Sequence, residues 1–93
     1  MNNEKLDNIR KKIDKLDHKL LDVIKKRTNL VKEVIKTKKF KKQIVDRSRI
    51  KKVLKSIQEL SKRKKIDTKI TRKIWVSMIN SYIDYEKRNF KKK

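Results

Sequence analysis

The sequence predicts an all-α fold, a three-helix protomer that associates with a second copy of itself. The 93 residues include no Gly and no Pro, the residues that usually punctuate hairpins and tight turns. Apolar residues instead recur at alternating steps of three and four, which is the spacing of a helical seam. A chain this short buries a modest fraction of its surface on its own. We therefore expect one domain over residues 1–93 and a homo-oligomer.

The first predicted helix extends to about Lys38 and carries an apolar row along one side. The row consists of Leu6, Ile9, Ile13, Leu16, Leu20, Val23, Leu30 and Val34. At 1.5 Å per residue this helix would be roughly 50 Å long, much longer than a small globule is wide. We therefore expect it to extend across a dimer.

Two shorter helices are predicted after a polar interruption at residues 39–45. Asp46 stands where an N-cap would open the second helix, the basic run Lys62–Lys65 ends it, and Asp67 is the expected cap of the third. The apolar positions are Ile50, Val53, Leu54, Ile57 and Leu60 in the second helix, and Ile70, Ile74, Trp75, Met78, Ile79, Tyr82, Ile83 and Phe90 in the third. Each set follows helical spacing, so all three helices fit one protomer.

The composition is strongly basic. Lys and Arg number 32 against 11 Asp and Glu, which gives a formal net charge of +21. Such an excess can attract nucleic acid or an anionic membrane. However, 25 of the basic residues are Lys. An AT-rich genome favours Lys at exposed positions of any protein, because lysine codons are rich in A. We therefore expect no membrane partner, and we do not take the charge by itself as evidence for a nucleic-acid partner.

Metal chemistry has little support in the sequence. Cys is absent and His18 is the only His, which argues against thiolate and histidine metal sites. Residues 1–7 contain no apolar leader, and no later stretch approaches the length of an apolar membrane span. We expect a cytoplasmic protein that uses no metal and no cofactor.

Arg27 interrupts the apolar row of the first helix, because it falls in the heptad register of Leu6, Ile13 and Leu20. A buried guanidinium is costly without a carboxylate or phosphate partner. Arg27 therefore indicates an anionic ligand, a salt bridge to another helix, or an arginine whose stem extends along the surface and carries the charge into solvent. Lys38 lies three turns further along nearly the same face, so the two cations could bracket a small ligand.

Arg10 lies about 25 Å from Arg27 along the same helix, too far for one small ligand. Taken alone, Arg10 would be a solvated residue. If Arg10, Arg27 and Lys38 all serve one site, Arg10 must come from a second chain whose first helix runs antiparallel. This geometry predicts an intertwined antiparallel homodimer with two shared sites.

These residues belong to a longer pattern with a family resemblance. The run Leu6-Asp7-x-Ile9-Arg10-x-x-Ile13-Asp14-x-Leu16-Asp17-x-x-Leu20-Leu21-x-x-Ile24-x-x-Arg27-x-x-Leu30-Val31-x-Glu33-Val34-x-x-x-Lys38 resembles the first helix of the all-helical chorismate mutases. Ile44-x-Asp46-x-x-Arg49 resembles that family's loop and the start of its second helix. Ile66-Asp67 with Ile74-Trp75-x-x-Met78-Ile79 resembles its third helix. The resemblance covers about residues 5–90.

The resemblance implies a Claisen rearrangement of chorismate to prephenate, an isomerase reaction of phenylalanine and tyrosine biosynthesis in the shikimate pathway. It implies that Arg27 binds one carboxylate of this dicarboxylate substrate and that the partner subunit's Arg10 binds the other. Lys38 would contact a carboxylate and the ether oxygen. The reaction needs no nucleophile, metal or cofactor.

Further positions match the family's active site. The resemblance implies that Arg49 is another active-site arginine and that Asp46 lies near the ring hydroxyl. Glu86 would donate a hydrogen bond to the ether oxygen, which requires a protonated carboxyl. Ile79 and Ile83 would line the apolar wall of the pocket.

Two residues depart from the mutase pattern. Ile50 stands where mutases usually carry a glutamate that holds the ring hydroxyl, and Tyr82 replaces a small polar residue. Both changes resemble the isochorismate pyruvate lyases, relatives on the same fold, whereas Asp46 and Glu86 favour a mutase. The alternatives are therefore the lyase, a pseudoenzyme that keeps the fold, and a non-catalytic basic helical dimer that binds nucleic acid.

Overall fold

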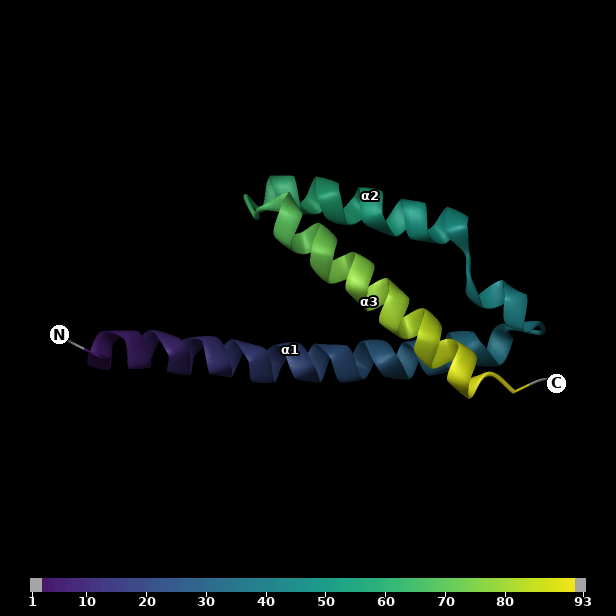
Figure 1. Cartoon of the computed structure of the whole chain (residues 1–93), viewed down its shortest axis with the longest axis horizontal. Coiled ribbons are helices and arrows are strands. Elements are labelled where there is room, and N and C mark those ends of the chain that lie inside the picture. The colour runs from purple at the N-terminus through teal and green to yellow at the C-terminus, as the bar shows by residue number, and fades with distance from the viewer. Residues whose placement is uncertain (1–2, 92–93) are drawn as a thin grey trace. The chain divides into compact units, whose positions relative to one another are not determined.

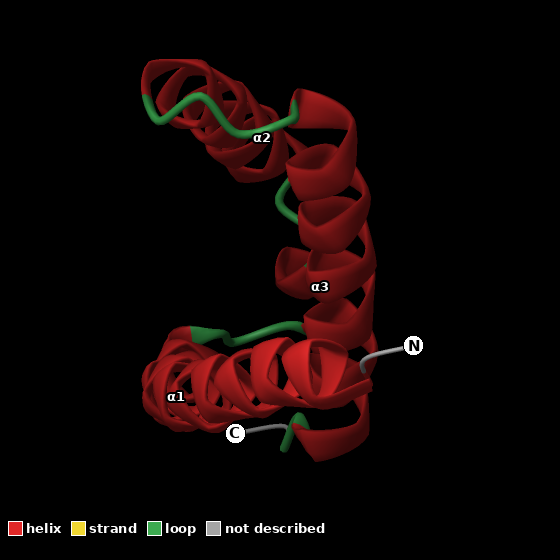
Figure 2. Ribbon diagram, turned by 90° about the vertical axis from the view of Figure 1, so that its left-hand side faces the viewer, coloured by secondary structure: helices red, strands yellow, loops and turns green. Residues whose placement is uncertain are grey.

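The computed structural model describes residues 3–91, which form helices and connecting loops (Figure 1). The elements are α1 (Asn3–Thr37), the 3-10 helix η1 (Lys41–Ile44), α2 (Arg47–Arg63) and α3 (Thr68–Asn89). Figure 2 shows no strand among the described residues. The prediction of an all-α chain with three α-helices is confirmed. The chain divides into two units, Met1–Glu33 and Val34–Lys93.

The length of α1 agrees with the sequence prediction. Its 35 residues end at Thr37, where the Thr37 hydroxyl donates to the Val34 carbonyl at 2.7 Å. Glu4 in the first turn and Lys36 in the last turn have the charges that stabilise the helix dipole. The helix therefore spans about 50 Å at 1.5 Å per residue.

The apolar row in residues 3–33 of α1 is exposed. Nine large apolar side chains have exposed fractions between 40% and 63%: Leu6, Ile9, Ile13, Leu16, Leu20, Leu21, Val23, Ile24 and Leu30. Isolated apolar side chains on a surface are ordinary, but a continuous row of them indicates an interaction surface. This part of α1 does not bury its own seam.

Local capping explains where α2 and α3 begin. The Asp46 side chain accepts a hydrogen bond from the backbone N–H of Arg49 at 3.0 Å, and the Asp67 side chain accepts from that of Lys69 at 2.8 Å. Each bond satisfies a backbone donor that has no partner inside the first turn of a helix. The predictions of Asp46 and Asp67 as N-caps are confirmed.

The turn between α2 and α3 has a left-handed residue. After Arg63, Lys65 takes a φ of 58°, and the Ile66 N–H donates to the Ser61 carbonyl at 2.9 Å. This is the Schellman arrangement, in which glycine is usual because a side chain disfavours positive φ. The basic run therefore ends α2 where the sequence predicted, and Lys65 adopts a left-handed backbone conformation that its side chain disfavours.

α2 and η1 both pack against α3 in the second unit. A polar contact lies between α2 and α3: the hydroxyls of Ser61 and Thr71 are 2.8 Å apart, and these residues are 3% and 9% exposed. Among the described residues, the buried large apolar side chains are Ile35 and Ile44. The unit therefore has a small core: its other apolar side chains are half-buried or exposed, and Leu60, Ile66, Ile70 and Ile74 are between 41% and 55% exposed. No helix in residues 3–91 combines the length and apolar character that crossing a bilayer requires.

Candidate functional site

The two arginines of α1 lie far apart on one helix. Arg10 is exposed and Arg27 is half-buried. They are separated by 17 positions, or about 25 Å of helix axis. A single copy of α1 therefore cannot bring both guanidinium groups to one small ligand.

Lys38 lies immediately after α1, where the helical hydrogen-bond pattern ends. Its backbone N–H donates to the Ile35 carbonyl at 3.1 Å, and its side chain is half-buried. Ile35 is only 8% exposed, so it anchors the point from which Lys38 projects.

Three predicted site residues gather at the start of α2. Asp46 is the N-cap: its Oδ1 accepts from the Arg49 N–H, and its carbonyl accepts from the Ile50 N–H at 3.0 Å. The Arg49 side chain is exposed, whereas Ile50 is half-buried. The cap fixes the carboxylate of Asp46 beside the first turn, and it uses only one of the two carboxylate oxygens.

The remaining predicted residues share one side of α3. Ile79, Tyr82, Ile83 and Glu86 follow helical spacing, and all four are half-buried. The Tyr82 ring makes an edge-to-face contact with Tyr85, with centroids 6.5 Å apart. This row therefore combines apolar, aromatic and acidic side chains on one strip of helix surface.

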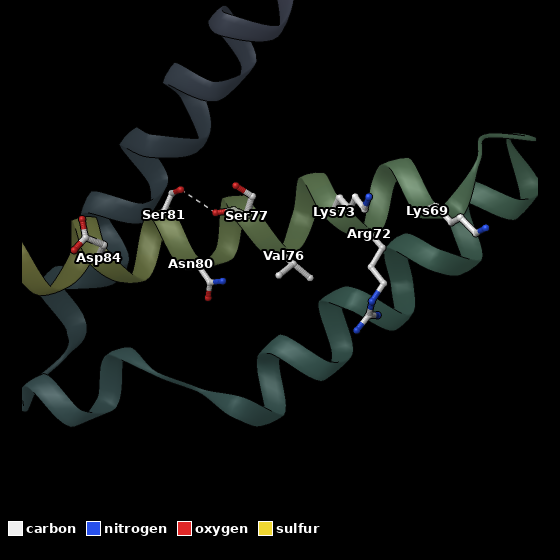
Figure 3. Close-up of a pocket in the computed structure, with 8 residues that line it drawn as sticks. All are labelled: Lys69, Arg72, Lys73, Val76, Ser77, Asn80, Ser81 and Asp84. Carbon is white, nitrogen blue, oxygen red and sulfur yellow. Dashed lines mark hydrogen bonds between the residues drawn. The ribbon is translucent and has the colours of Figure 1, made fainter.

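A groove with a volume of about 860 Å³ lies along α3. Figure 3 draws the residues that line it. Its lining residues are Lys69, Arg72, Lys73, Val76, Ser77, Asn80, Ser81 and Asp84. None of them was predicted as a site residue. All come from one helix, so the groove lacks the enclosing walls that bury most of a small ligand. It is an open surface on one helix, lined by polar residues and Val76, and it does not enclose a ligand.

The charge of the second unit favours an anionic ligand. Residues 34–93 contain 22 Lys and Arg against five Asp and Glu. A surface so rich in one sign of charge raises the local concentration of anions. Within residues 3–91, no three His, Asp or Glu side chains lie close enough together to hold a metal ion.

Sequence reasoning did not single out Gln43, which fixes the loop after Lys38. Its Oε1 accepts from the backbone N–H groups of Lys39 at 2.7 Å and Phe40 at 3.0 Å. The signal available in the sequence was a Gln three positions after the residue that opens a short helix, as in a capping box.

Comparison with known proteins found a matching family. A model of the chorismate mutase type II family matches residues 9–87, which is most of the chain. The matched range includes every residue predicted for the site, from Arg10 to Glu86. Among curated proteins and among solved structures, no match was found. The chain belongs to the chorismate mutase type II family.

Proposed function

We propose that this protein is a chorismate mutase that converts chorismate to prephenate without a metal or cofactor. The observation that carries the proposal is the family match over residues 9–87. The sequence resemblance, which implies that Arg10, Arg27 and Lys38 bind the substrate, supports it. We expect the enzyme to be one cytoplasmic domain that serves phenylalanine and tyrosine biosynthesis.

The proposed enzyme is an intertwined antiparallel homodimer, supported by the exposed apolar row of α1. The row is self-complementary in an antiparallel pair. In an antiparallel pair, each step forward along one helix is a step backward along the other. If Leu6 lies opposite the partner subunit's Leu30, then Ile13 lies opposite the partner subunit's Val23. Burying this row would remove from water the surface that one copy leaves exposed.

The same register supports a shared site. It sets Arg27 opposite the partner subunit's Ile9, one residue from the partner subunit's Arg10. Two guanidinium groups from different chains would then face one ligand. A dicarboxylate is the ligand that two such groups fit, since each planar fork can hold one carboxylate in a bidentate pair.

The proposed mechanism begins with substrate folding. Arg27 and the partner subunit's Arg10 hold the two carboxylates, so the substrate stays in the chair conformation from which it reacts. No covalent step with the protein is needed, because the rearrangement breaks a carbon–oxygen bond and forms a carbon–carbon bond within one molecule. Holding that geometry removes much of the entropic part of the barrier.

Charge stabilisation is the second contribution. Negative charge grows on the ether oxygen as its bond breaks, and donors aimed at that atom stabilise the transition state more than the ground state. We assign these donors to Lys38 and to the protonated carboxyl of Glu86. Ile79 and Ile83 provide the apolar wall that keeps water from these charges.

The start of α2 would hold the far side of the substrate ring. One Asp46 oxygen caps the helix, which leaves the other for the ring hydroxyl. Arg49 adds a cation at the same helix end. Because the cap bond to one Asp46 oxygen would orient the carboxylate, no further residue would be needed to position the other oxygen.

Isochorismate pyruvate lyase is the second candidate. Ile50 and Tyr82 favour it, because a half-buried isoleucine cannot accept a hydrogen bond from a ring hydroxyl as the usual glutamate does. A substrate without a hydroxyl at that carbon would fit this apolar side chain better.

A product assay separates the two reactions. The purified protein is offered chorismate and isochorismate in separate reactions, with Arg27→Ala as the control. Prephenate from chorismate supports the mutase, and pyruvate from isochorismate supports the lyase. No product from either substrate would contradict both and favour a pseudoenzyme or a nucleic-acid-binding dimer.

A further inference from the structure

We propose that the segment Lys39–Lys42 binds single-stranded nucleic acid, by stacking an unpaired base on Phe40 and pairing phosphates with lysines. We call Lys39, Phe40, Lys41 and Lys42 the Phe40 surface. The lysine excess of the chain gives no reason by itself to expect such a partner. An exposed aromatic ring among the lysines does, because every base has a face that can stack on a ring.

The ring and its neighbouring charges are accessible. Phe40 is 55% exposed, and Lys39, Lys41 and Lys42 are exposed as well. The Lys42 ammonium lies 5.8 Å from the centroid of the Phe40 ring. A phosphate bound by Lys42 would therefore bring its own or the next base to the ring.

The backbone of this surface is held in place by Gln43. Gln43 Oε1 accepts from the N–H groups of Lys39 and Phe40, and the Gln43 N–H donates to the Phe40 carbonyl at 3.0 Å. Ile44, only 5% exposed, anchors η1, which packs against α3. These contacts hold the loop in one conformation before a ligand binds. Binding would therefore cost less conformational entropy than binding to the same residues in a flexible chain.

The outer face of α2 extends the positive charge along the chain from this surface. Arg47, Lys51, Lys55 and Lys62 share one side of α2, and all are exposed. Within residues 3–91, none of these four side chains pairs with a carboxylate. A phosphate backbone that follows them would therefore compete with water and counterions, not with internal salt bridges.

Single strands fit this surface better than the other polyanions. A duplex hides its base faces, so Phe40 could stack only on unpaired bases. An anionic membrane would attract the lysines, but insertion needs a broader apolar face than one ring supplies. The proposal therefore predicts that the aromatic ring matters for single strands and not for duplexes.

The test compares Phe40→Leu with Phe40→Trp by fluorescence anisotropy. The probe is a labelled mixed-sequence RNA of about 12 nucleotides, in salt of about 0.15 M. We expect Phe40→Leu to lower the affinity about fivefold to a hundredfold, and Phe40→Trp to keep or raise it. The same strand annealed to its complement should bind wild type and Phe40→Leu equally. A DNA strand of the same sequence tells whether the sugar matters.

A matched pair of charge variants controls for net charge. One double variant carries Lys41→Gln and Lys42→Gln, and the control double variant carries Lys11→Gln and Lys25→Gln, which removes the same charge from α1. The first should weaken RNA binding more than the second. The first pair should also reduce the slope of affinity against salt by about one to two. Circular dichroism verifies that every variant is folded.

Several results would overturn the proposal. These are no binding of the RNA by wild type, equal affinity of wild type and Phe40→Leu, or equal losses from the two lysine pairs. Vesicles of phosphatidylcholine and phosphatidylglycerol are the remaining arm. A ring that matters for these vesicles and not for RNA would make the surface a membrane contact.

Discussion

Residues 3–33 and residues 34–91 differ in how their helices pack within one copy of the chain. In the first region nine large apolar side chains of α1 are at least 40% exposed. In the second, α2 and η1 pack against α3, and a buried pair of hydroxyls joins α2 to α3. The second region therefore has internal packing of its own, whereas the first presents a seam that another chain can cover.

This difference separates two kinds of variant. A change in the α1 seam should act through association, so its effect should depend on protein concentration. A change between α2 and α3 should act within one copy, so its effect should not.

Leu20→Glu should have the largest effect, because Leu20 lies near the centre of the exposed row. In the proposed antiparallel pair it faces the partner subunit's Leu16, and each buried unpaired carboxylate would cost about 3–5 kcal/mol. We expect the dimer to dissociate in sedimentation equilibrium. His18→Glu, on the opposite side of the helix, adds the same charge and should leave the dimer intact. Equal behaviour of the two variants would contradict the proposed seam.

Arg10→Ala and Arg27→Ala should each lower kcat/KM about a hundredfold, because each removes charged hydrogen bonds to a carboxylate. Mixing the two variants sharpens the test. A mixed dimer has one site with both arginines intact, so random exchange should restore about a quarter of wild-type activity. Recovery after mixing is measured by prephenate formation. No recovery after proven exchange would contradict sites shared between chains.

Glu86→Gln tests a residue that belongs to the second region alone. A glutamate can donate to the ether oxygen only when protonated, so wild-type activity should fall as pH rises, by about tenfold per pH unit once the carboxyl has titrated. The amide of Gln donates at every pH, so the variant should lose this fall. The measurement is the pH profile of kcat/KM. Identical profiles would exclude Glu86 as the donor.

Ser61→Ala should destabilise the second region by about 1–2 kcal/mol, since it leaves a buried Thr71 hydroxyl without its cross-helix partner. Ser81→Ala is the matched control. The Ser81 hydroxyl donates to the Ser77 carbonyl at 2.8 Å in an exposed position, where its loss should matter little. Urea unfolding at two protein concentrations measures both. A Ser61 effect that grows on dilution would assign this contact to association.

Lys65→Gly should stabilise the turn after α2 by about 0.5–1 kcal/mol, the smallest effect. Lys65 has a φ of 58°, a conformation that side chains disfavour and glycine adopts freely. Lys64→Gly is the control, because Lys64 has an ordinary φ of −85° and gains nothing from glycine. Thermal unfolding compares the two. Equal shifts in Tm would show that the left-handed backbone is not the cause.

Sequence reasoning predicted the fold to within a few residues at each helix end. Asp46 and Asp67 cap their helices as predicted, α1 ends at Thr37 beside the predicted end, and the basic run ends α2. These features depend on neighbours in the chain, through hydrogen bonds and spacings of three or four residues. Local rules therefore suffice to find them.

For the candidate site, too, the residues could be recognised in the sequence, but their arrangement around one ligand could not. The residue types at Arg10, Arg27, Lys38 and Glu86 were recognisable from spacing and family resemblance, and the family itself is now shown over residues 9–87. Their meeting at one ligand is a prediction that the mixed-dimer experiment tests. No single helix contains that information, since it depends on how two copies pair.

Patterns along the chain were enough to predict the helices, their caps, the apolar row and the family. Four features became known from the folded structure: the apolar row in residues 3–33 is exposed, the hydroxyls of Ser61 and Thr71 are in contact, and Lys65 has a positive φ. In addition, Gln43 holds the backbone of the loop in which the Phe40 ring is exposed. The two groups of features differ in the sequence separation of the contacts on which they depend. Helix formation follows from contacts within one turn, whereas exposure, loop conformation and contacts between helices depend on which surfaces the folded chain brings together.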